Sequence, residues 1–196
     1  MKKQSNDSNK SVRVLKKSVP HRTVGGVNVQ HFNSSAVEYE SYNERNTISL
    51  LSLCHDVVGI RSQPIIFNYL DDLGKHRKHI PDFEVTLDSG ELLYLEVKAI
   101  EDLLSPVNTE KYARIAKEYL RQNFNFRFLT NIQIESQPVF DVVKLLNRYI
   151  NSPVSDECLK LSQKVLDSDA MTIRNFMKEA QLDLREVYTL IAKRHI

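Results

Sequence analysis

Residues 80–98, with the sequence IPDFEVTLDSGELLYLEVK, carry the clearest structural pattern in the chain. Apolar and polar side chains alternate on both sides of residues 88–90, which is typical of two antiparallel strands joined by a short loop. A three-residue loop with Gly90 in the left-handed conformation would pair Leu87 with Glu91. The sequence therefore predicts a β-hairpin with a defined register.

Charged groups gather on one face of this predicted hairpin. The register places Asp82 directly opposite Glu96, with about 5 Å between their Cβ atoms, and Lys98 points to the same face because strand side chains alternate. Apolar side chains at 83, 85, 93, 95 and 97 occupy the opposite face. Two facing carboxylates repel each other unless a cation lies between them or one is protonated. A divalent ion that prefers oxygen ligands suits the pair, namely Mg²⁺ with Mn²⁺ as a substitute.

Lys98 completes a set of groups suited to phosphodiester hydrolysis. Its ammonium group would orient, or help to deprotonate, a water that attacks phosphorus, while the metal ion neutralises the developing charge. The alternative is a solvated strand face, on which Glu96 and Lys98 are ordinary surface charges. The Pro81-Asp82 pair, in a register that opposes the two acids, favours the catalytic interpretation.

The surrounding sequence predicts an α/β core, because a helix is followed by a mixed sheet and then by another helix and strand. A capping box of Ser41 and Glu44 begins the first helix, which runs to about Cys54. A second helix is expected from Asn108 or Thr109 to about Gln122. Strands are expected over 36–40, 57–60, 65–70, 76–80 and 124–130, and a last core helix over 139–150.

Both ends of the chain differ from this core. The first 22 residues hold seven of the 27 Lys and Arg residues and one of the 25 acidic residues, so 20 basic and 24 acidic residues remain, a net charge of −4. A basic arm over residues 1–35 suits phosphate contact, although it is equally typical of a solubilising terminus. Residues 151–153 mark a boundary. The predicted domains are thus the arm 1–35, the core 36–150 and a unit 151–196 with helices near 155–166, 171–180 and 183–194.

Composition argues against a membrane-spanning, secreted or disulfide-rich protein. No stretch approaches the roughly 18 apolar residues that span a bilayer, and the N-terminus has no apolar signal core. Cys54 and Cys158 lie far apart, and the six histidines show no zinc spacing. We therefore expect a cytoplasmic protein with two buried thiols and no membrane partner.

Four motifs resemble those of one nuclease family: residues 40–44 (ESYNE), 62–64 (SQP), 80–83 (IPDF) and 96–98 (EVK). The last two resemble the PD-(D/E)xK nuclease superfamily. All four together resemble TnsA, the endonuclease subunit of heteromeric transposases, including those of CRISPR-associated transposons. The resemblance is close over residues 36–100. It departs at Asn43, where the family usually has an apolar residue before the helix glutamate.

The resemblance implies a restriction-endonuclease-like mixed sheet flanked by helices. It implies that Asp82, Glu96, the backbone carbonyl of Val97 and Glu44 hold the metal ion. The implied catalytic residues are Glu44, Asp82, Glu96 and Lys98, with Lys98 positioning the nucleophile.

Glu44 also has a simpler interpretation, because a capping-box glutamate needs no catalytic role. However, Glu44, Ile48 and Leu51 fall on one helical stripe, which directs the carboxylate toward the core. The basic cluster 75–79 likewise has two interpretations: a protected strand edge, or a contact with the DNA backbone.

The function implied by the family is hydrolysis of phosphodiester bonds at the 5′ ends of a bacterial transposon during cut-and-paste transposition. The implied partners are double-stranded DNA at the transposon ends, an integrase-type transposase that acts at the 3′ ends, and an ATP-binding regulator. The C-terminal unit resembles a small helix-turn-helix or winged-helix unit and would dock a partner.

Two alternatives remain open. One is a restriction-type or junction-resolving nuclease of the same fold, although no recognition insert is evident. The other is a catalytically inert DNA-binding or assembly subunit, although all three groups at 82, 96 and 98 are present.

Overall fold

The chain divides into two units, residues 1–136 and 137–196. A computed structural model describes residues 11, 23–29, 35–166 and 171–196. All seven basic residues of the predicted arm lie outside these described residues. Within the described residues, no helix combines the length and apolarity needed to cross a membrane. Of the two cysteines expected to be buried, Cys158 is buried and Cys54 is half-buried.

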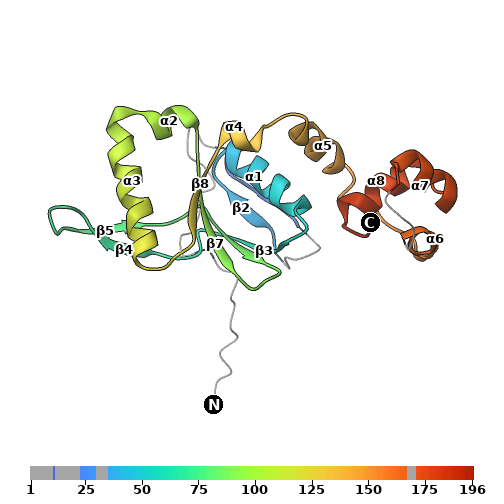
Figure 1. The fold of residues 1–196 in the computed structure, drawn as a ribbon, viewed down its shortest axis with the longest axis horizontal. Helices are drawn as coiled ribbons and strands as arrows, with labels where there is room; N and C mark the ends of the chain where they lie inside the picture. Colours follow the sequence, from blue (N-terminus) through green and yellow to red (C-terminus); the bar gives the residue numbers. More distant parts are fainter. Residues whose placement is uncertain (1–10, 12–22, 30–34, 167–170) are drawn as a thin grey trace, which may run out of the picture. The chain divides into compact units, whose positions relative to one another are not determined.

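A four-stranded mixed sheet runs through the first unit (Figure 1). Its strands, in spatial order, are β3 (Val57–Ser62), β6 (Phe83–Leu87), β7 (Leu92–Lys98) and β8 (Phe126–Thr130). Strand β6 is antiparallel to both β3 and β7, whereas β8 is parallel to β7. A parallel pair needs a crossover connection, which here contains α2 (Ile100–Leu104) and α3 (Pro106–Arg121).

Helices cover both faces of this sheet, as Figure 1 shows for α1 (Tyr42–Leu53) and α3. This confirms the predicted mixed sheet flanked by helices. On one face, α1 packs against side chains of β6 and β7 in a core that includes Ile48, Phe83, Val85, Leu95 and Val97. On the other face, α3 packs in a largely aromatic core that includes Phe67, Tyr94, Tyr112, Ile115, Tyr119 and Phe126.

Tyr119 lies at the centre of the aromatic core. Its ring stacks between Phe67, with centroids 3.8 Å apart, and Phe126, with centroids 4.1 Å apart. Stacked aromatic pairs stabilise a core beyond the area that they bury. This side chain is fully buried, so its position relative to the sheet is tightly constrained.

Two further antiparallel pairs extend the first unit. Strand β1 (Gly25–Val27) pairs with β2 (Val37–Tyr39). Val29, two residues after β1, is fully buried. The prediction of an arm over 1–35 is therefore wrong for this part. The diglycine that suggested a loop instead permits close packing, because a Cβ at Gly25 would collide with the Tyr39 ring.

The second pair is a hairpin of β4 (Phe67–Leu70) and β5 (His76–His79). Its turn includes Gly74 at φ 71°, a conformation that favours glycine. Residues 75–78 are exposed, whereas His79 is only partly exposed. The predicted basic strand therefore exists, and its last residue turns toward the core.

The helices of the first unit differ from prediction at three places. Helix α3 begins at Pro106 rather than near Asn108, because a proline in the first helical turn needs no hydrogen bond from its nitrogen. The short helices α2 and α4 (Asn131–Ile134) were not expected from sequence. Helix α4 begins with a capping box of Thr130 and Gln133.

The second unit contains α5 (Val139–Leu146), α6 (Asp156–Leu166), α7 (Ile173–Ala180) and α8 (Leu184–Ala192). The division falls at 136/137 rather than at the predicted 150/151, so α5 lies in this unit. Tyr149, just after α5, packs against Tyr188 of α8 with centroids 5.5 Å apart. Residues 137–166 and 171–196 contain no strand, so a wing is not confirmed.

The core of the second unit includes Phe176, Val187 and Leu190. Ile173 and Leu184 are apolar but exposed, at 43% and 45%. Each of these two residues is the first of its helix.

Candidate active site

The hairpin of β6 and β7 has the predicted register. Phe83 pairs with Leu95 and Thr86 pairs with Leu92. Gly90 has φ 83° and closes the loop with a hydrogen bond from its N–H to the Leu87 carbonyl. Continuing this register by one residue places Asp82 opposite Glu96.

Asp82, Glu96 and Lys98 converge at this end of the hairpin. The Lys98 Nζ lies 2.6 Å from Oε1 of Glu96 and 3.7 Å from Oδ2 of Asp82. The same Oδ2 accepts a hydrogen bond of 2.7 Å from the backbone N–H of Val97. These contacts bring the three predicted side chains together, with the ammonium group close to both carboxylates.

The backbone carbonyl of Val97 lies in the same group of atoms, since it accepts a hydrogen bond of 3.1 Å from Lys98 Nζ. The backbone carbonyl of Asp82 accepts a hydrogen bond of 2.8 Å from the N–H of Gln63. Gln63 has φ 44°, an uncommon conformation for a residue with a side chain. The Gln-Pro motif thus helps to hold the residue that begins the candidate site.

The site is largely buried, and burial shifts the pKa values of its acidic residues. Burial, followed by the nearby charge of Glu96, raises the pKa of Asp82 to about 8. Burial also acts to raise the pKa of Glu96, but its contacts with His79 and Lys98 outweigh burial and leave that pKa lowered. Without a metal ion, the pair therefore shares one proton near neutral pH, with Asp82 as its holder.

Lys98 keeps its positive charge in this setting. Burial acts to lower its pKa, but the two carboxylates outweigh burial and raise it above the ordinary value. A lysine with a raised pKa is a cation and a hydrogen-bond donor at neutral pH, not a base. In the metal-free site, Lys98 therefore has the charged form that suits orientation of a water, the first of the two roles considered for it.

Two side chains that the sequence analysis did not assign to the site also reach it. His79 Nε2 lies 3.3 Å from Oε2 of Glu96, and His79 Nδ1 lies 3.0 Å from the Tyr119 hydroxyl. The alternation of β5 indicates which face His79 takes, but no local pattern indicates its partners. Tyr119 comes from α3, forty residues further along the chain.

Glu44 lies in the first turn of α1 and close enough to influence the site. Its carboxylate accepts hydrogen bonds of 2.7 Å from the Glu40 N–H and 2.9 Å from the Ser41 hydroxyl. Burial is the main cause of its raised pKa. Its charge also contributes to the raised pKa of Asp82. Ser41 therefore caps the helix by accepting from the Glu44 N–H, but the predicted capping box is not complete, because the Glu44 carboxylate accepts from the Glu40 N–H and not from the Ser41 N–H. A role for Glu44 at the metal remains a prediction.

The donor set suits a divalent ion with few protein ligands. In the described part of the chain, no group of three or more His, Cys, Asp or Glu side chains is arranged to hold a metal ion. A site here would consist of Asp82, Glu96 and the Val97 carbonyl, completed by water and phosphate oxygens, as Mg²⁺ prefers. The mutual repulsion of the two acids, with the Val97 carbonyl beside them, fits a divalent cation bound between them.

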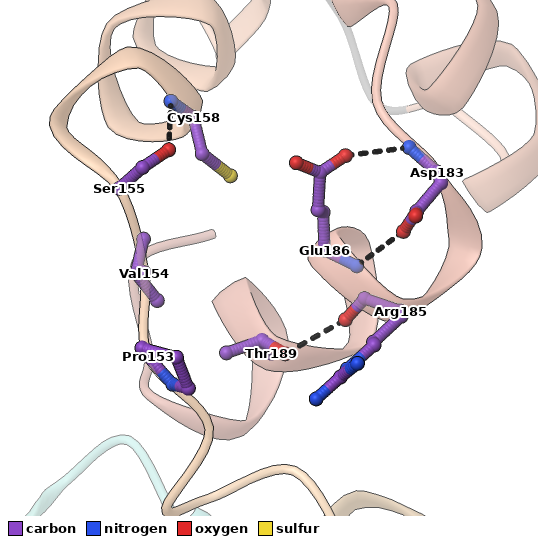
Figure 2. A pocket seen from close by; sticks show the side chains of 8 residues that line it. All are labelled: Pro153, Val154, Ser155, Cys158, Asp183, Arg185, Glu186 and Thr189. Carbon is purple, nitrogen blue, oxygen red and sulfur yellow. Dashed lines mark hydrogen bonds between the residues drawn. The ribbon is translucent and has the colours of Figure 1, made fainter.

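A separate hollow of about 430 Å³ lies in the second unit (Figure 2). Cys158 lies on one side of it, and Asp183 and Glu186 lie on the other. Figure 2 shows that both acids bond to the backbone at the start of α8, each to the N–H of the other. Because these carboxylates already cap a helix, we assign no chemistry to the hollow.

The fold and the site together define a class of protein. A mixed sheet flanked by helices, with an Asp-Glu-Lys set at the end of two strands, fits a nuclease. Residues 54–131 match the family described as "TnsA-like endonuclease N terminal". This match confirms the resemblance to TnsA-like nucleases and indicates a nuclease of the transposase type. The matched residues include Asp82, Glu96 and Lys98. No curated protein that was compared with the chain matches it.

Proposed function

We propose that this chain is a metal-dependent DNA endonuclease subunit of a heteromeric transposase, which hydrolyses phosphodiester bonds at the 5′ ends of its transposon. The observation that carries the proposal is the convergence of Asp82, Glu96 and Lys98 within a segment that matches TnsA-like endonucleases. Mg²⁺ is the proposed cofactor. Double-stranded transposon-end DNA, an integrase-type transposase and an ATP-binding regulator are the proposed partners.

In this proposal, Asp82 and Glu96 hold the metal ion with the Val97 carbonyl. Bound Mg²⁺ would neutralise charge on the phosphate and favour ionisation of the attacking water. Lys98, whose ammonium group lies 2.6 Å from Glu96, is placed to donate a hydrogen bond to that water or to a phosphate oxygen. The water oxygen forms a new P–O bond as the P–O bond to one sugar oxygen breaks. The cut strand is left with a phosphate at one end and a hydroxyl group at the other.

Metal binding and the proton on Asp82 compete in this arrangement. A carboxyl with a pKa near 8 is mostly protonated at neutral pH, and a cation between the two acids would displace that proton. The metal ion would therefore also bring Asp82 to its ionised form, which is the form that binds an oxygen-seeking cation.

The proposal is tested by cleavage of transposon-end DNA in Mg²⁺, with the purified chain alone and with its proposed integrase-type transposase partner. We expect weak cutting by the chain alone and cutting at the 5′ ends when the transposase is present. Vigorous, sequence-specific cutting by the chain alone would instead identify a restriction-type nuclease. No cutting under either condition, in Mg²⁺ or Mn²⁺, would identify an inert subunit.

A further inference from the structure

His79 and Tyr119 form a buried extension of the candidate site that the proposed hydrolysis does not use. Three elements converge there: β5 supplies His79, α3 supplies Tyr119 and β7 supplies Glu96. The side chains of His79 and Glu96 are exposed by only 11% and 8%. The His79 ring stands edge-on to Tyr119 and Phe126, with centroids 5.6 and 5.9 Å away. These contacts leave the imidazole little freedom to rotate.

The proton positions along this contact follow from the groups at its two ends. An ionised Glu96 carboxylate can only accept a hydrogen bond, and it faces His79 Nε2, whereas the Tyr119 hydroxyl, whose pKa burial raises, keeps its proton and can donate it. Its oxygen lies 3.0 Å from His79 Nδ1. A neutral imidazole that accepts at Nδ1 carries its own proton at Nε2. That nitrogen faces Oε2 of Glu96 at 3.3 Å.

The contact between His79 Nε2 and Glu96 Oε2 is close but not well aligned. Neither atom has another hydrogen-bond partner within the part of the chain that the structure describes. A buried donor and a buried acceptor without partners each cost free energy. A small rotation of the Glu96 carboxylate would align the pair and satisfy both atoms.

We propose that His79 is a positioning residue, which holds one oxygen of Glu96 so that the other faces Lys98 and the metal ion, and that Tyr119 selects the His79 tautomer that does so. The effect of His79 on metal binding rests on the proposed function, because it requires a metal ion at Glu96. The tautomer of His79 can be tested whether or not the proposed function is right. Groups that orient metal ligands in this way typically change metal affinity by about 10- to 100-fold when removed.

The tautomer is tested first, without metal. Side-chain ¹⁵N NMR on the full chain, at one pH at which the imidazole is neutral, distinguishes a protonated Nε2 from a protonated Nδ1. We expect the Nε2–H form to dominate in the wild-type protein. In Tyr119→Phe, which keeps the stacked ring but removes the donor, we expect a mixture of the two forms.

Tyr94→Phe is the matched control for that measurement. Tyr94 belongs to the same aromatic core, but its hydroxyl interacts with Glu84 rather than with His79. This control should leave the His79 signals unchanged. A dominant Nδ1–H form in the wild-type protein, or equal spectra for wild type and Tyr119→Phe, would overturn the role of Tyr119.

The effect on the site is tested by Mn²⁺ affinity, measured by electron paramagnetic resonance. His79→Leu should weaken Mn²⁺ binding about 10- to 100-fold. His79→Gln should recover much of the loss, because its amide can still donate a hydrogen bond to Glu96. A merely space-filling His79 would give the opposite order, since leucine suits a buried site better than glutamine.

The outcomes separate this inference from the proposed function. If the wild-type protein binds Mn²⁺ and His79→Leu binds it within two-fold of wild type, the positioning role is wrong although the metal site stands. If the wild-type protein binds no Mn²⁺, the metal site is wrong. The contact between His79 and Glu96 is then judged by the NMR spectrum alone. A mixture of the two His79 tautomers, or a dominant Nδ1–H form, in the wild-type protein would show that this contact is wrong as well.

Discussion

Lys98 places one positive charge beside both carboxylates of the site. Its ammonium group contacts Glu96 at 2.6 Å and lies 3.7 Å from Asp82. Because the two carboxylates raise its pKa in the metal-free site, it is a cation there, and we expect its contribution to hydrolysis to be electrostatic. Losing such a preorganised donor typically costs about 10²-fold or more in rate.

We therefore expect Lys98→Ala to lose at least about 10²-fold in partner-dependent 5′-end cleavage while still binding its partner in a pull-down. Lys111→Ala, which removes an exposed lysine of α3, is the matched control and should cleave normally. Circular dichroism would show that both variants are folded. Near-normal cleavage by Lys98→Ala would remove Lys98 from the mechanism.

Asp82 makes the stability of the metal-free protein depend on pH. Its pKa is raised from 3.8 to about 8, so between these values the folded state binds more protons than the unfolded state. Stability from this group is therefore fully present below about pH 4 and is lost as pH rises toward 8, by at most about 1.4 kcal/mol per pH unit.

Chemical unfolding in EDTA at pH 5, 7 and 8.5 would measure this dependence. Asp82→Asn should flatten it, because the amide does not titrate, and excess Mg²⁺ should reduce it in the wild-type protein. A wild-type pH profile that matches that of Asp82→Asn would contradict the raised pKa of Asp82.

Among the secondary-structure elements, the β6–β7 hairpin could be predicted fully, because its signals are local. Gly90 fixes the loop, alternation fixes the faces, and loop length fixes the register. The contact of His79 with Glu96 could not be predicted, since it depends on how a separate two-stranded sheet packs beside α3. The β1 strand was missed for a related reason: Gly25 and Gly26 look like a loop until the Tyr39 ring is placed over them.

The β4–β5 hairpin is the element whose exposed cations lie nearest in sequence to the site. Arg77 is already paired with Asp71 at 2.8 Å, whereas Lys75 and Lys78 are exposed. DNA affinity falls as the salt concentration rises, and each lysine that contacts a phosphate makes the slope of log affinity against log salt concentration steeper by about 0.9.

We expect Lys75→Ala and Lys78→Ala to weaken DNA binding in low salt and to reduce that slope by about one each. Fluorescence anisotropy with a labelled duplex at several salt concentrations would measure both quantities. Lys160→Ala, on exposed surface of the second unit, is the control. Unchanged slopes would mean that this hairpin is a protected strand edge and not a DNA contact.

For the molecule as a whole, the division at residues 136/137 separates the candidate catalytic groups from the helices that follow. All of Glu44, Asp82, Glu96 and Lys98 lie in the first unit. The sequence placed this boundary at a Pro-containing break near 151, because the amphipathic pattern of α5 does not reveal which core it joins. That choice depends on contacts such as Tyr149 with Tyr188, which are distant in sequence.

We expect a chain that ends at Ser136 to keep a folded nuclease core and to bind metal, but to lose partner-dependent cleavage. Thermal unfolding, Mn²⁺ binding and 5′-end cleavage would be measured on the truncated and full chains. A truncated chain that cleaves normally with its partner would show that the second unit does not dock the transposase.

The central claim is that Asp82 and Glu96 hold one divalent metal ion. Calorimetric titration of the full chain with Mg²⁺, and of Asp82→Ala in parallel, tests it most directly. We predict one bound ion per chain in the wild-type protein, with proton release near neutral pH as Asp82 ionises, and no measurable binding in Asp82→Ala at millimolar metal. Equal binding by the two proteins, or binding by neither, would contradict the claim.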